Sequence, residues 1–419
     1  GTWRFADGKL VVDADSLRLL DRAPISRFHP LLARGVVIDL AGGHLSSRFV
    51  LREPASDRAI ADVTLAHDLD RGTGNAVFAV RPVTFDHDLQ PDTLTPLALG
   101  VVANASGTVQ GEGRIDWNPD RITSSGRFSS DGVSFAAAFG PAEGVSGTVV
   151  FTDLLGLVTA PDQKLKIASI NPGIEANDGV LSFALQPQGV LVVNGASWPF
   201  LDGRMTLLPT RMKLGVAEVR HYEMALEGIN ATRFVEKTEL GNIAATGVFD
   251  GRLPLVFDQN GGRIEGGSLI SRAPGGNVSY VGTLTYKDLS PMANFAFNTL
   301  RSLDYRRMAI TLDGDLTGEI VTRVRFDGVK QGAGAKRNFV TRRLGRLPIQ
   351  MNVNLKAPFF SLISSFKRMY DPKFYTAQLL DQIKAQAKAE GLLAPSAPPP
   401  RQSTPPRSGV QPPAIGKKP

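Results

Sequence analysis

Cysteine is absent from this chain of 419 residues, and histidine occurs only five times. Without cysteine the protein has no disulfide bonds, no cysteine nucleophile and no thiolate metal site. The sequence also lacks the G-x-S-x-G, H-E-x-x-H and Walker motifs of common hydrolase, metalloprotease and nucleotide sites. We therefore predict that the protein is not an enzyme and uses no cofactor. A glycan-active enzyme on a β-scaffold is the least favoured class.

Two short segments combine histidine with aspartate, namely His67-Asp68-Leu69-Asp70 and Asp86-His87-Asp88. Imidazole and carboxylate groups can bind cations. Turns between strands favour aspartate for another reason, because its side chain accepts hydrogen bonds from the turn backbone. We take the turn as the explanation of both segments and predict no metal site.

Long apolar runs and a strong charge are also missing. The sequence contains no run of about 18 apolar residues, the length that a membrane-spanning helix needs. No signal peptide is recognisable. The missing targeting segment carries no weight, because the chain begins with Gly1 rather than methionine. The net charge is +7, and about half of the excess lies after Leu393, in Arg401, Arg407, Lys417 and Lys418. The nearly neutral body argues against a nucleic-acid partner.

What the sequence does contain is a long series of short strands. Glycine (43) and proline (28) are frequent, as many turns require. Apolar and polar residues alternate most clearly in 308–312, 320–326 and 349–356, which indicates strands with one apolar face. Turns are predicted at Asp7-Gly8, Gly42-Gly43, Asp131-Gly132 and Gln259 to Gly262. This spacing favours an antiparallel meander over βαβ units.

A meander of this length cannot remain a flat open sheet, because long open sheets curl and their unpaired edges associate. A closed barrel, stacked sandwiches and a curled sheet with an apolar concave face all fit the alternation. The first two would bury the alternating residues in an ordinary core. The third would leave an apolar groove that something apolar must fill.

Helices are predicted in few places. Residues 289–303 show a helical period after Ser290-Pro291, a typical helix start, and 232–240 can form a short helix. After Pro358 the composition becomes helical over 359–369 and 373–392. The second of these is amphipathic, which fits capping of a sheet better than lying on a membrane. The tail from Ala394 is rich in proline and is predicted to be disordered.

Several stretches form one ordered series: VSGTVVFTDLLGL (145–157), IASINPGIEANDGVLSF (167–183), GNIAATGVFDGRLPLVFDQNGGRIEGGSL (241–269), the segment 281–328 with its LDYRRMAITLDGDLTGEI, and IQMNVNLKAPF (349–359). Over about residues 140–370 this series resembles the C-terminal region of the YdbH family. That family belongs to the AsmA-like and TamB-like bacterial envelope proteins.

The resemblance implies a mostly β fold, an elongated curled antiparallel sheet of the repeating β-groove type with a few short helices and a helical C-terminal segment. It implies intermembrane phospholipid transport between the inner and outer membranes, with acyl chains shielded in a hydrophobic groove. It also implies a periplasmic protein held in the inner membrane by an N-terminal anchor that this chain does not include. Its implied partners are phospholipids and a small outer-membrane lipoprotein bound by strand addition.

On this interpretation, alternate residues of the C-terminal strands are candidates for the groove wall: Leu253, Leu255, Phe257, Ile310, Leu312, Val324, Phe326, Met351, Val353 and Leu355. A basic cluster that begins at Lys330 supplies candidates for contact with anionic headgroups or the membrane, namely Lys336, Arg337, Arg342, Arg343 and Arg346. A solvated loop explains the same cluster and is the favoured interpretation.

The predicted organisation has four parts. Residues 1–140 form the N-terminal part of the groove, 141–357 its family-like C-terminal part, 358–393 an amphipathic helical segment and 394–419 a disordered proline-rich tail. The alternative function is that of an envelope assembly or scaffold protein, which binds a partner by β-augmentation and carries no lipid.

Overall fold

The computed structural model describes residues 1–24, 26–98, 102–137, 140–171, 174–214, 218–237, 243–258, 261–280, 302–316, 318–331 and 349–358. The chain divides into two units, 1–368 and 369–419, and every described residue belongs to the first. The predicted helices over 359–369 and 373–392, the tail from Ala394 and the basic residues from Lys336 to Arg346 therefore lie outside the described residues.

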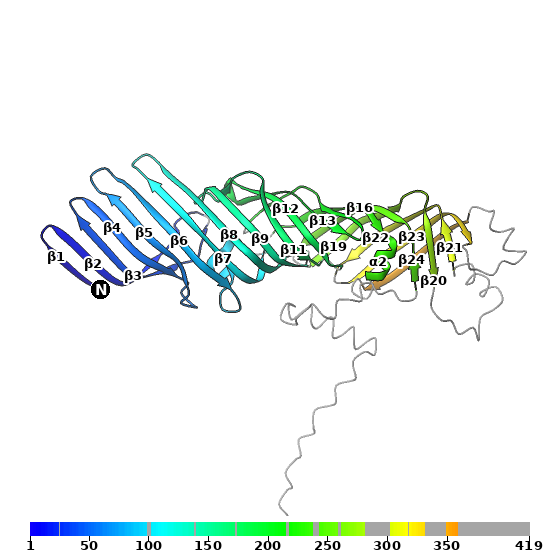
Figure 1. The fold of residues 1–419 in the computed structure, drawn as a ribbon, viewed down its shortest axis with the longest axis horizontal. Coiled ribbons are helices and arrows are strands. Elements are labelled where there is room, and N and C mark those ends of the chain that lie inside the picture. The colour runs from blue at the N-terminus through cyan, green and yellow to red at the C-terminus, as the bar shows by residue number, and fades with distance from the viewer. Residues whose placement is uncertain are drawn as a thin grey trace, which may run out of the picture. The chain divides into compact units, whose positions relative to one another are not determined.

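Strands dominate the first unit, and many of them begin or end near a glycine, proline or aspartate turn (Figure 1). The first nine are β1 (Thr2–Ala6), β2 (Lys9–Leu19), β3 (Leu31–Ala41), β4 (His44–Arg52), β5 (Ala59–Asp68), β6 (Thr73–Phe85), β7 (Ala103–Trp117), β8 (Ile122–Ala137) and β9 (Gly140–Asp153). The next seven are β10 (Val158–Thr159), β11 (Gln163–Ile170), β12 (Ala176–Gln186), β13 (Val190–Phe200), β14 (Gly203–Leu207), β15 (Thr210–Lys213) and β16 (Arg220–Asn230).

The remaining strands are β17 (Ile243–Ala245), β18 (Val248–Asp258), β19 (Gly261–Ser271), β20 (Gly276–Tyr280), β21 (Ser302–Tyr305), β22 (Arg307–Asp315), β23 (Glu319–Gln331) and β24 (Ile349–Pro358). The described helices are short: α1 (Pro91–Leu94), α2 (Ala231–Lys237) and the 3-10 turns Pro96–Ala98 and Pro187–Gly189. The 24 strands of the described ranges form one sheet in which each recorded strand pair is antiparallel. The predicted fold class, a mostly β antiparallel meander with few helices, is confirmed.

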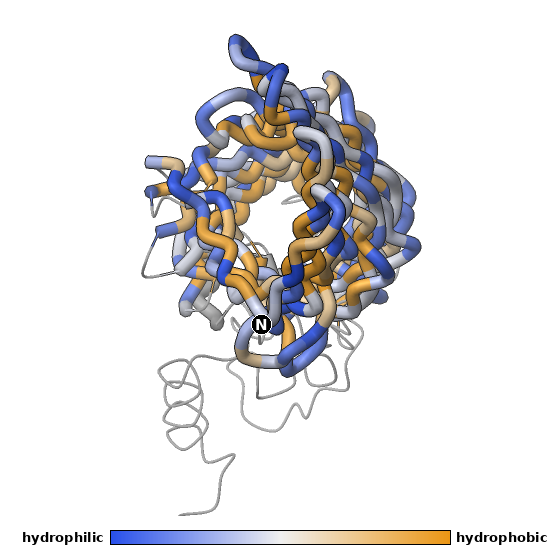
Figure 2. Tube along the Cα trace, turned by 90° about the vertical axis from the view of Figure 1, so that its left-hand side faces the viewer, coloured by the Kyte–Doolittle hydropathy of each residue, from blue (hydrophilic) through white to orange (hydrophobic). Residues whose placement is uncertain are grey.

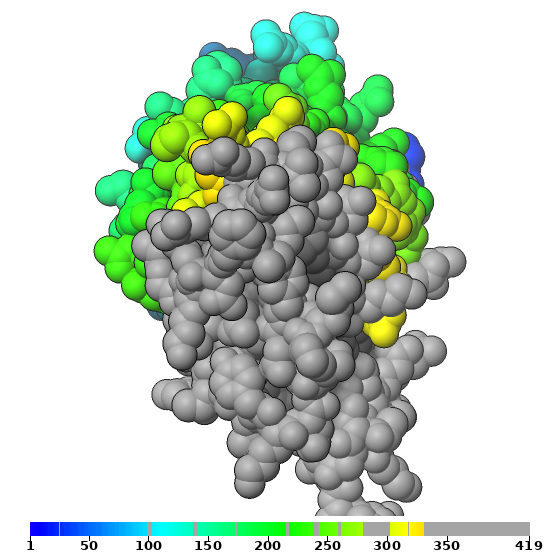
Figure 3. Space-filling model, turned by 90° about the vertical axis from the view of Figure 1, so that its right-hand side faces the viewer, coloured from blue at the N-terminus to red at the C-terminus, as the bar shows by residue number. Residues whose placement is uncertain are grey.

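The main path of the sheet runs from β1 to β9 in sequence order and then through β11, β12, β13, β14, β16, β18, β19, β22, β23 and β24. β17, β20 and β21 form a side branch that joins it at β23. Figure 3 shows the end of the unit opposite β1, where yellow atoms of residues around 302–331 lie beside green atoms of residues that precede them in the chain.

Successive strands run in opposite directions, so their connections fall alternately at the two ends of the strands. We call the two rows of connections the first and second rims. The first rim carries the connections at 7–8, 42–43, 69–72, 118–121 and 154–157. The second rim carries those at 20–30, 53–58 and 86–102, whose described parts are longer and less regular. Every strand from β1 to β9 therefore spans the distance between the two rims.

The two faces of the sheet differ in polarity. Figure 2 looks along the unit and shows the strands curled around a common axis, with hydrophobic residues toward that axis and hydrophilic residues outside. The outer face carries cross-strand ion pairs, among them Arg272–Asp250 at 2.7 Å and Arg323–Asp313 at 3.3 Å. Such exposed pairs contribute little stability each, but they mark the outer face as the solvated one.

One predicted hairpin is wrong. The sequence suggested a reversal at Asp131-Gly132, but these residues lie inside the single long strand β8, which pairs with β7 on one side and β9 on the other. Both ladders shift register after Ser130, so the strand bulges and bends instead of turning back. The Ser130 hydroxyl holds the bend by donating to the Thr108 carbonyl (2.7 Å) and accepting from the Gly132 N–H (3.1 Å).

The helical predictions meet a mixed outcome. The helix predicted over 232–240 is confirmed up to Lys237 as α2, and residues 238–240 lie outside the described part of the chain. The start of α2 is stabilised because the Asn230 side chain accepts a hydrogen bond from the Thr232 N–H (2.9 Å). The helix predicted over 289–303 is wrong at its end, since Ser302 and Leu303 lie in β21. Leu303 is paired with β20 and β23 there, and this sheet pairing outweighs the local helical period. Residues 289–301 lie outside the described part of the chain.

Candidate functional site: the apolar inner face

A continuous row of apolar residues crosses the inner face from β11 to β23. In an antiparallel ladder, residues directly opposite each other point to the same face, so the register traces the row from strand to strand. Its members are Ile167, Gly179, Trp198, Met205, Leu226, Gly251, Leu269, Ile310 and Val324, which we call the central row. Across the whole row the side chains carry a single polar atom, the indole nitrogen of Trp198.

A second row runs parallel to the central row, two residues along each strand. It comprises Leu165, Leu181, Ala196, Leu207, Met224 and Leu253, and continues beyond a bulge with Gly267, Leu312 and Thr322. Leu207, Met224 and Leu253 lie on strands paired on both sides, and yet they are only partly buried. An apolar side chain in such a position is exposed because the face above it is incompletely covered.

Seven of the predicted groove residues lie on this face. Leu253, Ile310, Val324 and Phe326 belong to or pack against the main buried cluster of the unit, while Leu255, Phe257 and Leu312 belong to or pack against a neighbouring cluster around Ile264 and Ile320. For the candidates on β24, the register sets Met351 opposite Phe326, Val353 opposite Val324, and Leu355 opposite Thr322. That these ten residues contact lipid stays a prediction.

The N-terminal strands continue the apolar face, and no candidate was named there from the sequence. One row across β4 to β9 comprises Phe49, Val63, Phe78, Gly113, Gly126 and Phe151. The two glycines leave space above the backbone, which Leu154 fills, since a Cβ added at Gly113 would lie 2.8 Å from its Cδ2. The signal available in the sequence was the same apolar alternation used for the C-terminal strands.

Trp198 lies against the backbone of Gly179, its neighbour on β12 in the central row. A Cβ added at Gly179 would lie 2.0 Å from the Trp198 Nε1 atom, so only glycine fits beneath the indole. Trp198 is 3% exposed. Within the described part of the chain, its Nε1 and the Ser47 Oγ are the buried side-chain atoms that have no hydrogen-bond partner. The inner wall is thus nearly free of polar groups that could hold a ligand at one fixed place.

Three aromatic side chains pack together in the main buried cluster of the unit. Tyr305 contacts Phe249 and Phe326, with ring centroids 6.5 and 5.9 Å apart, and its hydroxyl donates to the Thr246 carbonyl at 2.7 Å. Burial raises the pKa of the Tyr305 hydroxyl to about 12, so it stays protonated and keeps this hydrogen bond.

The histidine and aspartate segments form turns and pairs. The Asp68 carboxylate accepts hydrogen bonds from the N–H groups of Asp70 and Arg71, both at 3.0 Å. Asp86 pairs with Arg58 at 2.7 Å, and the Trp117 indole donates to His67 Nδ1 at 3.1 Å. Among the described residues, no group of three or more His, Asp or Glu is arranged to hold a metal ion.

In the described ranges, none of the helices combines the length and the apolar character needed to cross a membrane. The basic candidates Lys336, Arg337, Arg342, Arg343 and Arg346 have no described position, and Lys330 lies exposed near the end of β23.

Comparison with curated proteins and with solved structures gives no match for this chain. Comparison with family models does: the model described as "YdbH-like: Intermembrane phospholipid transport protein YdbH" matches residues 1–374, which includes every described strand. This is a lipid transport family and not an enzyme family, and transport between membranes implies a location in the cell envelope. The chain belongs to the YdbH-like family of intermembrane phospholipid transport proteins.

Proposed function

We propose that the inner face of the sheet carries phospholipid acyl chains, with the headgroups kept in water at the rims. The observation that supports this mechanism is the continuity of the two apolar rows from strand to strand, together with the incomplete burial of several of their members. Leu207, Met224 and Ile310, for example, remain partly exposed although their strands are paired on both sides. A closed protein core would bury such positions fully. An acyl chain supplies the missing cover.

Passive shielding is sufficient for movement along such a face. Each buried CH₂ group stabilises the bound lipid by about 0.8 kcal/mol, and the wall offers nearly the same apolar contacts at each strand. Neighbouring positions are therefore close in free energy, and a lipid can shift between them without a proton transfer or any other chemical step. The protein then acts as a conduit and not as an enzyme.

The partners expected of the conduit follow from the family resemblance and from the edges of the sheet. Among the described strands, β1 pairs with β2 and β24 pairs with β23, and each has no second neighbour. An unpaired edge is what strand addition requires, so β24 is our candidate for binding a small outer-membrane lipoprotein. An N-terminal anchor in the inner membrane and headgroup contacts by the basic residues 336–346 complete the proposal.

The mechanism is tested by placing a charge on the inner face and the same charge on the outer face of one strand. Ile310 lies in the central row, and its neighbour Thr311 is exposed on the opposite face of β22. A carboxylate in hydrocarbon costs about 2.5–3.5 kcal/mol, so Ile310→Asp should lower local lipid occupancy by about a hundredfold. Native mass spectrometry of the purified protein reports the bound phospholipid.

The variant Thr311→Asp is the matched control and should keep its lipid. If both variants retain phospholipid equally, the inner face is not the binding surface. If the unaltered protein carries no lipid and still captures a lipoprotein partner through an edge strand, the alternative function as an envelope assembly protein is supported instead. The unpaired edges at β1 and β24 are the observation that favours this second candidate.

A further inference from the structure

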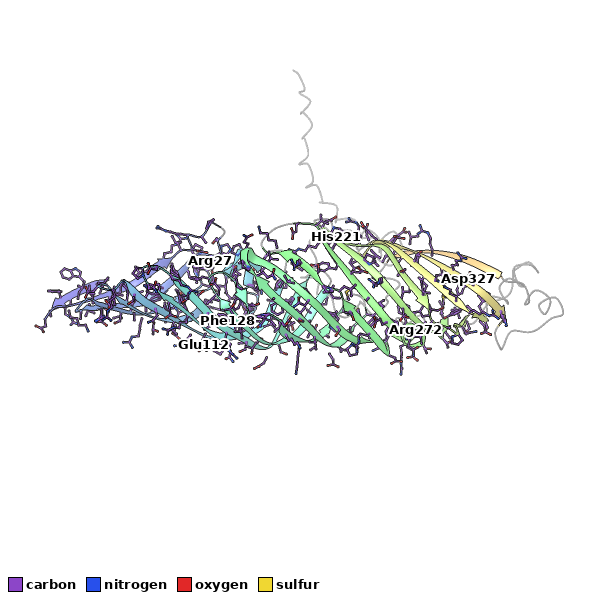
Figure 4. All side chains as sticks on the ribbon, turned by 90° about the horizontal axis from the view of Figure 1, so that it is seen from above. Arg27, Glu112, Phe128, His221, Arg272 and Asp327 are labelled. Atoms are coloured by element: carbon purple, nitrogen blue, oxygen red, sulfur yellow. The ribbon has the colours of Figure 1, made fainter. Side chains whose placement is uncertain are left out.

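The connection between β2 and β3, described for residues 20–24 and 26–30, leaves the second rim and reaches the first through Arg27. The Arg27 side chain donates to the carbonyl of Leu155 at 2.9 Å, although 128 residues separate them. Leu155 lies in the β9–β10 connection on the first rim, and β2 and β9 are far apart in the strand order. This contact therefore joins the two rims across the inner face. Figure 4 shows Arg27 level with Phe128 and Glu112 of β8 and β7 along the long axis.

The arginine is held in place by a buried carboxylate on the same connection. Asp21, whose side chain is 2% exposed, pairs with Arg27 at 2.7 Å. It accepts hydrogen bonds from the Arg27 Nε (3.0 Å) and from the Arg27 backbone N–H (2.7 Å). This bidentate pairing fixes the plane of the guanidinium. The remaining guanidinium nitrogen, Nη1, is directed at the Leu155 carbonyl.

A second connection from the same rim reinforces the first. The His29 N–H donates to the Leu94 carbonyl at 2.8 Å, and the Thr95 hydroxyl donates to the Arg27 carbonyl at 2.6 Å. Leu94 belongs to α1, in the connection between β6 and β7. The two connections are thus bound to each other at Arg27 and His29.

The side of these connections that faces the sheet is apolar. Phe28 and Leu94 pack against the buried cluster of Leu31, Val36 and Val63 on the N-terminal inner wall. From the first rim, Leu154 reaches over Gly113 and Gly126. The protein's own side chains therefore occupy the space above β3 to β8 that an acyl chain would need.

We propose that the described residues of this connection, 20–24 and 26–30, form an autoinhibitory strap, which closes the inner face over β3 to β8 and excludes phospholipid from this stretch until the contact between Arg27 and Leu155 is released. The proposal rests on the proposed function, since it concerns the path of the same lipid. Acyl chains would compete with Phe28 and Leu94 for the wall, and the headgroup would have to cross the seam that Arg27 closes. The strap is therefore a gate between the N-terminal and C-terminal stretches of the conduit.

The test compares lipid contact beneath the strap with lipid contact far from it. A photo-reactive amino acid is placed at Phe78, on the wall beneath the strap, or at Ile310 in the central row. The whole chain is incubated with vesicles of phosphatidylethanolamine and phosphatidylglycerol that carry a radiolabelled phospholipid, and cross-linked lipid is counted. In the protein with the unaltered strap, the photo-reactive amino acid at position 310 should cross-link to lipid strongly, and the one at position 78 only weakly.

Release and locking of the strap give the decisive comparison. Arg27→Gln keeps the length of the side chain and removes its charge, and labelling at position 78 should rise about tenfold, which corresponds to about 1.4 kcal/mol. Because the chain has no native cysteine, Ser26→Cys and Leu155→Cys can be joined by a thiol-specific cross-linker. This lock should hold labelling at position 78 low and leave position 310 unchanged.

Equal labelling at position 78 in the locked and released proteins would overturn the strap proposal. Absence of lipid at position 310 in every variant would instead overturn the proposed function. Should Arg27→Gln fail to fold, the locked protein before and after cleavage of a reducible cross-linker supplies the same comparison. In that case, labelling at position 78 that does not rise on cleavage contradicts the proposal.

Discussion

At the scale of single residues, the clearest effect is that of a buried ion pair on the charge of its carboxylate. Asp21 and Arg27 are the clearest case, because a carboxylate with almost no exposed surface is kept ionised by one guanidinium. The Arg27 side-chain hydrogen bonds hold the pKa of Asp21 far below its usual range, and backbone N–H groups of Arg27 and Ala23 add to the effect against the cost of burial. A neutral amide at position 21 would lose the charge and leave Arg27 without its partner.

We expect Asp21→Asn to lower the free energy of unfolding by about 1–3 kcal/mol at neutral pH, the range for hydrogen bonds to charged groups. Because the folded-state pKa of Asp21 lies below its unfolded value, this contribution is complete above about pH 4 and is lost as the pH falls toward the folded-state pKa. Urea denaturation of both proteins should therefore show a difference that is constant near neutral pH and shrinks in acid.

The matched control is Asp62→Asn, which removes the partner of Arg81 on the outer face. Asp62 is 32% exposed and Arg81 is 71% exposed at the side chain, so the loss should stay below about 1 kcal/mol. A larger loss for Asp62→Asn than for Asp21→Asn would show that burial of the pair does not decide its contribution.

At the scale of elements, the inner wall depends on glycines that lie beneath large side chains. The fit of Gly179 under Trp198 leaves no space for a methyl group. Gly179→Ala should displace the indole and destabilise the protein by about 1–3 kcal/mol through overpacking. Tryptophan fluorescence reports the displacement, and denaturant unfolding reports the stability.

Gly132→Ala serves as the control for this substitution. Its nearest neighbour to an added Cβ is the Gly144 Cα at 3.8 Å, an ordinary van der Waals contact. The control should leave both the fluorescence and the midpoint of unfolding nearly unchanged. If Gly179→Ala behaves in the same way, the wall around Trp198 repacks easily and is not shaped by that glycine.

The strands were predictable because each one carries its own signal. Alternation and turn residues identified the pairs around Gly42-Gly43 and the C-terminal strands near Ile310 and Val324, and the structure confirms them as β3 to β4, β22 and β23. The reversal at Asp131-Gly132 failed because local residues suit a turn and a bulge equally well. The outcome there depends on two neighbouring strands that lie far from it in sequence.

The strap could not have been predicted from sequence. Its defining contact joins Arg27 to a backbone carbonyl at Leu155, and a carbonyl is present at every residue. In the sequence, this connection shows polar residues with Pro24 and Pro30, as an ordinary loop does. Family-level transport was predictable from the ordered motifs, while the residues that contact lipid remain a prediction.

At the scale of the whole molecule, a conduit built from successive strands is a path in series. In the proposed conduit, each lipid that moves along the inner face must pass the partly exposed residues Leu207, Met224 and Ile310 in turn. A charge at one strand therefore interrupts transfer for the whole length, whereas a binding surface with independent sites would lose only the lipid of that strand. The two arrangements give different results when two blocks are combined.

We expect Leu207→Asp and Ile310→Asp each to reduce phospholipid transfer between donor and acceptor vesicles to near background, because each places a carboxylate in the path. The double variant should be no slower than either single variant, since one block already stops the flow. Bound lipid measured by native mass spectrometry should nevertheless fall further in the double variant. Thr206→Asp with Thr311→Asp, on the outer face of the same strands, controls for the added charge. Transfer rates that fall multiplicatively in the double variant would contradict a single continuous path and indicate separate routes along the sheet.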